Sequence, residues 1–100
     1  MSTAPDFQLD TSTPATLGVS GVLSFDTAAA ALEAIQSTLA SSDAARLDLA
    51  GVSHCDSAGL ASVLAAAADA DRRGRPVRVV GMPSGMLALA QVCEVDRLLG

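Results

Sequence analysis

The 100 residues suffice for one compact domain and leave no room for a second core. Half of them are hydrophobic and 17% are charged, a composition that excludes an intrinsically disordered chain. The net charge of -5 disfavours nucleic acid and anionic lipid as partners, and because every basic residue except the histidine is an arginine, lysine-dependent sites such as a Walker A loop are excluded.

The N-terminal quarter of the chain is expected to contain a tail and two strands. Residues 1–10 lack the basic and long apolar regions of a secretory signal, and we expect residues 1–6 to form a flexible tail. A short edge strand is predicted over residues 7–11. Residues 15–23 repeat with the period of two that is typical of a strand with one buried face. The apolar side chains on that face are Leu17, Val19 and Leu23.

A helix is predicted to follow, with Asp26 or Thr27 as its N-cap. Its apolar residues recur at spacings of four, three and four, which places them on one stripe. These residues are Ala28, Leu32, Ile35 and Leu39. The polar run at residues 41–43 ends the helix.

A second buried strand is predicted over residues 46–52, because its apolar residues alternate. Its inner face is expected to hold Leu47, Leu49 and Gly51. Residues 53–55 are expected to form a tight loop into the next helix.

That second helix is predicted to begin near Asp56 and to stop at Gly74, which precedes Pro76. We expect its buried face to consist of Leu60, Val63, Leu64 and Ala67. Ala66 is expected to face outward.

The chain is predicted to close with a strand at residues 77–80, a turn at 81–83 and a third helix capped by Ser84. The apolar residues of this last part are Leu87, Ala90, Cys93, Val95, Leu98 and Leu99. Strands that alternate with helices predict a single α/β domain with a mixed, mainly parallel sheet of four to five strands and helices packed on one side.

Metal, cofactor and catalytic sites are not expected. The only histidine, His54, lies too close in the chain to Ser57 for a serine triad, and Cys55 and Cys93 do not have metal-ligand spacing. Both cysteines are interpreted as small, reduced core residues. The most apolar run, at residues 59–68, has about half the length that crosses a bilayer.

One segment, Asp56-Ser57-Ala58-Gly59-Leu60, allows two interpretations. In the structural one, Asp56 is an ordinary N-cap and Gly59 lets the helix approach the sheet. In the functional one, a partner approaches Gly59, and the Ser57 hydroxyl at the positive end of the helix tolerates an anion or an added phosphate.

These features together resemble a STAS domain over nearly the whole chain, and residues 1–100 are predicted to form that one domain. The residues that carry the resemblance are Leu47-Asp48-Leu49, Val52, Asp56-Ser57-Ala58-Gly59-Leu60, Gly74 and Val77-Arg78-Val79-Val80. The family includes sulfate-transporter tails and anti-sigma factor antagonists. The resemblance implies a mixed sheet with helices on one side. It also implies that the Asp-Ser-x-Gly-Leu segment is the recognition surface, whose serine is phosphorylated in antagonists.

Within the family, antagonists usually read Gly-Glu-Leu-Asp before the first helix, whereas this chain has Ser24 at the acidic position. Three features are similar instead to the small STAS subunit of the Mla phospholipid-transport ABC system. They are the run at residues 23–28, the Asp-Ser-Ala-Gly-Leu-Ala sequence from Asp56, and Pro83 followed by Leu87-Ala88-Leu89-Ala90.

That similarity implies a cytoplasmic, non-catalytic subunit, held at the inner-membrane face through its partner. It would bind the ABC ATPase of a transporter that maintains outer-membrane lipid asymmetry, and would support its assembly and activity. Ser57 would be the central contact and His54 would lie at the rim, while the surface would be shaped by Asp56, Ala58, Gly59 and Leu60. The alternative is an antagonist whose Ser57 is phosphorylated by an anti-sigma factor serine kinase. Neither branch implies a cofactor, a metal, nucleic acid or membrane insertion.

Overall fold

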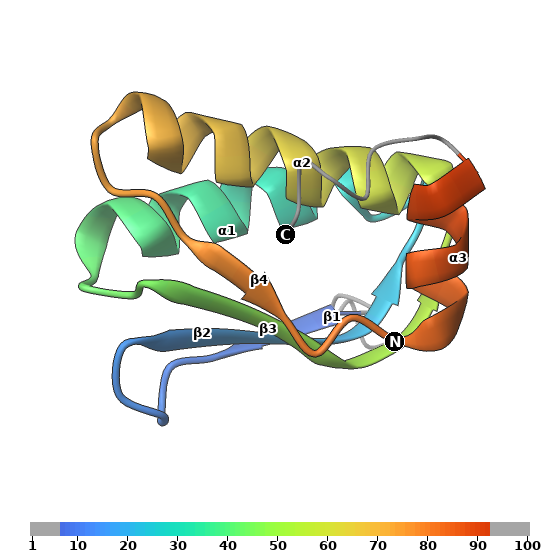
Figure 1. Cartoon of the computed structure of the whole chain (residues 1–100), viewed down its shortest axis with the longest axis horizontal. Helices are drawn as coiled ribbons and strands as arrows, with labels where there is room; N and C mark the ends of the chain where they lie inside the picture. The colour runs from blue at the N-terminus through green and yellow to red at the C-terminus, as the bar shows by residue number, and fades with distance from the viewer. Residues whose placement is uncertain (1–6, 93–100) are drawn as a thin grey trace, which may run out of the picture.

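Residues 7–92 are described by a computed structural model, in which two long helices cover one face of a four-stranded sheet (Figure 1). The elements are β1 (Phe7–Asp10), β2 (Thr16–Leu23), α1 (Ala28–Ser41), β3 (Arg46–Cys55), α2 (Ser57–Arg72), β4 (Arg78–Val80) and α3 (Ser84–Val92). The strand order is β1-β2-β3-β4, with β1 antiparallel to β2 and the other neighbours parallel. The predicted fold class and element order are confirmed. Outside the described residues lie the expectations for residues 1–6 and for Cys93, Val95, Leu98 and Leu99.

The core lies between the sheet and the two long helices. In β2, the buried side chains are those that the alternation predicts: Leu17, Val19 and Leu23. In α1, the buried side chains are Ala31, Ile35 and Leu39. Ala28 and Leu32, predicted for the same stripe, are only half-buried, because they lie on the flank of α1 that borders an open groove toward α2.

β3 is longer than predicted, because residues 53–55 continue the strand instead of forming a loop. Its pairing with β2 is interrupted twice, and at each place β3 contains one residue more than β2. The first interruption moves the inward side from Leu47 and Leu49 to Val52. Gly51 is therefore exposed and not buried as predicted. It allows a close approach of the two strands, since a Cβ at this position would lie 2.7 Å from a β2 side chain.

α2 ends as predicted, with Gly74 in the left-handed region at φ +75. Its buried residues are Gly59, Leu60, Ser62, Val63, Ala66 and Ala70. The expectation that Ala66 faces outward is wrong, and Leu64 and Ala67 are only half-buried. An alanine-rich helix offers little contrast between its faces, so its sequence marks the buried stripe poorly.

α3 stands at the end of the sheet, beside the end of β3 (Figure 1). Leu87, predicted to be buried, is 41% exposed, whereas Met86 and Ala90 are buried. Nearly every residue of this short helix is apolar, so its pattern does not distinguish the faces. Within residues 7–92, no helix is both long and apolar enough to cross a membrane.

Candidate functional site

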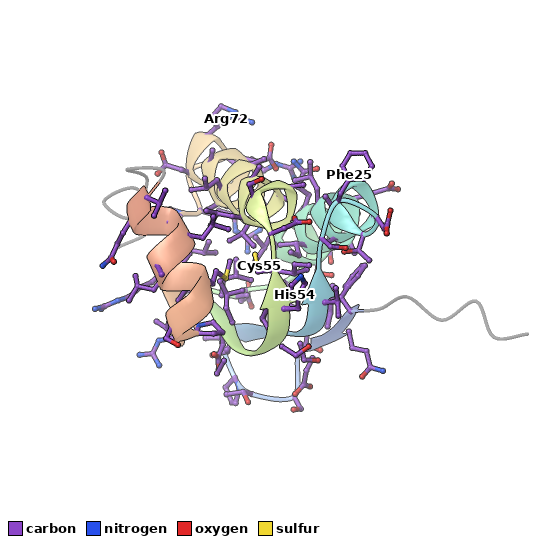
Figure 2. The ribbon with its side chains drawn as sticks, turned by 90° about the vertical axis from the view of Figure 1, so that its right-hand side faces the viewer. Phe25, His54, Cys55 and Arg72 are labelled. Atoms are coloured by element: carbon purple, nitrogen blue, oxygen red, sulfur yellow. The ribbon has the colours of Figure 1, made fainter. Side chains whose placement is uncertain are left out.

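The predicted site residues lie at the end of the domain where β2 and β3 finish and α1 and α2 begin, the end that faces the viewer in Figure 2. We call this region the Ser57 end and define it by Phe25, His54, Asp56, Ser57 and Ala58. Ser57 is exposed as the first residue of α2, and His54 is exposed near the end of strand β3. His54 also lines a cleft of about 320 Å³ between the end of β3 and the start of α3.

Asp56 joins two segments of the chain. Its Oδ1 accepts a hydrogen bond of 2.9 Å from the Gly59 N–H, which caps α2 as the sequence predicts. Its Oδ2 accepts a second bond of 3.0 Å from the Phe25 N–H in the loop between β2 and α1. The two carboxylate oxygens are thus both engaged, and Asp56 fixes that loop against the start of α2.

Gly59 is required by the fold of the chain itself. It is buried, and a Cβ added to it would collide with the backbone carbonyl of Leu23 and lie 2.8 Å from the Leu23 Cβ. The structural interpretation therefore accounts for this glycine without a partner. Leu60 is also buried, at 2% exposure, so Gly59 and Leu60 support the Ser57 end from beneath.

Phe25 is the feature that the sequence reasoning missed. It is one of only two phenylalanines in the chain, yet its side chain is 81% exposed. The loop that carries it is held at both ends: Asp56 binds the Phe25 N–H, and the buried Thr27 Oγ1 accepts a bond of 2.9 Å from the Ser24 N–H and donates one of 3.1 Å to the Val22 carbonyl. Thr27 occupies the N-cap position without a side-chain bond to α1, and Asp26 is exposed. The one sequence signal for Phe25 is that a rare aromatic residue stands in a polar loop.

A shallow apolar groove runs between the first halves of α1 and α2. Its lining residues are Ala28, Ala29, Leu32, Ala58, Ala61, Ser62 and Ala65. All but one are alanine or leucine, and the groove begins at Ala28 and Ala58, which follow the Phe25 loop and Ser57 in the chain. The Ser57 end thus combines an exposed aromatic ring, a small hydroxyl and an apolar depression, a combination suited to protein recognition.

Electrostatics at this end are set by Asp56. The hydrogen bond from the Gly59 N–H, and then that from the Phe25 N–H, hold the pKa of Asp56 below its usual value of 3.8. Burial has the opposite effect on Cys55: together with the neighbouring Asp56 charge it raises the pKa of the thiol to about 11. Cys55 is half-buried against the core as a free thiol, which keeps it unreactive at neutral pH.

The Asp56 carboxylate predicts a pH dependence of stability. Because its pKa is lower in the folded chain, its contribution is present above about pH 3.8 and is lost as the pH falls through the folded pKa. We expect Asp56→Asn to lower the urea midpoint at pH 6. The midpoint of this variant should also fall less than that of wild type between pH 5 and pH 3. Some acid dependence of stability should remain in this variant, because the Ser12 N–H also lowers the pKa of Asp10. Asp26→Asn is the matched exposed control, and identical pH slopes for wild type and Asp56→Asn would contradict the role of Asp56.

A family model described as "Mlab, STAS domain" matches residues 8–100. The anti-sigma factor antagonist SpoIIAA in its unphosphorylated form has a similar structure, with a TM-score of 0.69 and 16% identity over 91% of this chain and 83% of that chain. The Bacillus cell fate determinant SpoIIAA in the phosphorylated form is also similar, with a TM-score of 0.64 and 17% identity over 91% of this chain and 86% of that chain. At such identities the likeness concerns the fold alone. Curated proteins give no match.

Proposed function

We infer the function from the premise that this chain belongs to the STAS domain family, whose model covers residues 8–100. We propose that it is a non-catalytic, cytoplasmic subunit of a phospholipid-transport system. In this role it binds the ABC ATPase through the Ser57 end and supports assembly and activity of the transporter. The Mlab description of the matching model supports this branch of the family.

The observation that carries the proposal is the exposed Phe25 ring. An aromatic side chain held on an anchored loop loses little conformational freedom on binding and can fill a pocket of a partner. Ser57 and Ala58, which follow Asp56 in the chain, are small, so a partner surface can approach the start of α2 closely. The groove between α1 and α2 extends the same apolar surface.

The second candidate is an anti-sigma factor antagonist regulated by phosphorylation of Ser57. Its support is the exposed position of Ser57 at the first residue of α2, where the helix dipole stabilises an added phosphate. The fold likeness to SpoIIAA is compatible with this candidate.

Capture of the full chain from native cells distinguishes the candidates. Trypsin cleaves after Arg46 and Arg72, so Ser57 is recovered in the peptide of residues 47–72, which also holds Ser53 and Ser62 and therefore needs fragment-ion localisation. We expect an ABC ATPase together with unmodified Ser57. A serine kinase together with a phosphate on Ser57 would establish the antagonist instead.

Phe25→Ala makes the same experiment specific for the Ser57 end. We expect it to reduce capture of the ATPase about tenfold or more, because buried aromatic anchors dominate such contacts. Leu87→Ala, which truncates another partly exposed apolar side chain, is the matched control and should leave capture unchanged. If Phe25→Ala and Leu87→Ala capture the ATPase equally well, Phe25 is not part of the contact.

A further inference from the structure

A second unusual surface lies at the opposite end of the domain, where α1 and α2 finish and β3 and β4 begin. Arginines gather there from distant parts of the chain: Arg46, Arg72, Arg73, Arg75 and Arg78. This is unexpected in a chain with a net charge of -5. Parallel strands joined by helices bring the starts of β3 and β4 together with the end of α2, so the clustering follows from the topology.

Three of these arginines have carboxylate partners. Arg72 and Arg73 lie 3.4 Å and 3.0 Å from Asp69, and Arg75 lies 3.3 Å from Asp43. Across residues 7–92 no such ion pair is formed by Arg46 or Arg78, and both are exposed. We call Arg46 and Arg78 the arginine pair.

The members of the arginine pair are register partners on neighbouring parallel strands. Their Cα atoms are therefore about 4.8 Å apart, and their side chains leave the same face of the sheet. Since the next residue, Leu47, points into the core, this face is the one turned away from the helices. The adjacent carboxylate on β3, Asp48, accepts a hydrogen bond of 2.9 Å from the Ala50 N–H instead. The fold thus holds two like charges side by side, which is unfavourable unless an anion joins them.

We propose that the arginine pair is a docking site for an acidic segment of a partner protein, separate from the Ser57 end. Two adjacent guanidinium groups match closely spaced carboxylates in charge and in bidentate geometry. A lipid surface is recognised by clusters of four to eight basic residues, and nucleic acid by many phosphate contacts, whereas this site offers two unpaired charges on an anionic protein. Because the 16 residues of α2 span roughly 24 Å between the two ends, both surfaces can be occupied at once.

A fluorescent hexaglutamate peptide is the probe for this site, titrated against the purified full chain. We expect a dissociation constant of roughly 0.1–1 mM at low salt that weakens steeply with ionic strength. Amide NMR shifts should map to Arg46, Arg78 and their neighbours and not to Ser57. The double variant Arg46→Gln/Arg78→Gln should weaken binding about tenfold or more, without lowering the urea midpoint, since it removes a repulsion.

The matched control is Arg72→Gln/Arg73→Gln, which removes the same charge from ion-paired arginines at the same end. It should change the affinity by less than about twofold. Equal weakening by both double variants would show a general charge effect and overturn the site. Shifts at the Ser57 end, or no peptide binding at millimolar concentration, would do the same. Sedimentation of the chain with vesicles of equal phosphatidylglycerol and phosphatidylcholine, abolished in Arg46→Gln/Arg78→Gln, would assign the pair to lipid and also overturn the proposal.

Discussion

Replacement of Gly59 by valine is expected to destabilise the domain by roughly 3 kcal/mol or more and to lower its melting temperature by more than about 10 °C. The reason is local. The start of α2 rests on the backbone of Leu23 at the end of β2, and any Cβ at position 59 collides with that carbonyl group. A backbone atom cannot rotate away as a flexible side chain can, so α2 must move and the Asp56 cap must open.

Three further variants locate the effect along the same helix. Gly59→Ala should already be destabilising, because the collision involves the Cβ itself. Ala66→Val should cost about 1–3 kcal/mol, since Ala66 is fully buried. Ala68→Val, at an exposed position, should stay within about 0.5 kcal/mol of wild type. Thermal and urea unfolding measure all four variants, and a Gly59→Ala protein that melts with wild type would show that α2 does not lie this close to β2.

Large side chains with a clear period made most of the fold predictable. In β2, Leu17, Val19 and Leu23 alternate with smaller residues, and the structure buries all three. The period is less informative in α2, where alanine occupies buried, half-buried and exposed positions alike, so that the pattern places Ala66 on the wrong side. The strand at β3 was predictable from residue 46, but its inner face beyond Leu49 was not, because its two extra residues break the alternation and no local sequence rule predicts such a bulge.

The candidate site divides in the same way. Asp56 as an N-cap and Gly59 as a close approach follow from short-range chemistry, and the sequence indicates both. The second bond of Asp56 reaches Phe25, 31 residues earlier, and the arginine pair joins residues 46 and 78. Contacts between residues so far apart in the chain depend on which strands become neighbours. They cannot be predicted from one sequence until the topology is known.

Substitution of Ser57 by aspartate is expected to have the largest effect on partner binding under the proposed function, a loss of about 30-fold or more for the purified ABC ATPase. The new charge would lie next to Asp56 in the chain, whose two carboxylate oxygens are already hydrogen-bonded. A partner that covers this surface would have to bury the charge without a counter-ion. The fold itself should be unaffected, because the first residue of α2 lies at the positive end of the helix dipole.

Ser57→Ala provides the contrast, because it removes an exposed hydroxyl and introduces no charge. We expect it to retain affinity for the ATPase within about fivefold of wild type. Ser37→Asp, at an exposed serine in the second half of α1, adds the same charge away from the Ser57 end and should bind as wild type does. Calorimetric titration of the four proteins, each first shown to melt normally, gives the comparison. If Ser57→Asp and Ser37→Asp weaken binding equally, the ATPase responds to net charge and does not dock on the Ser57 end.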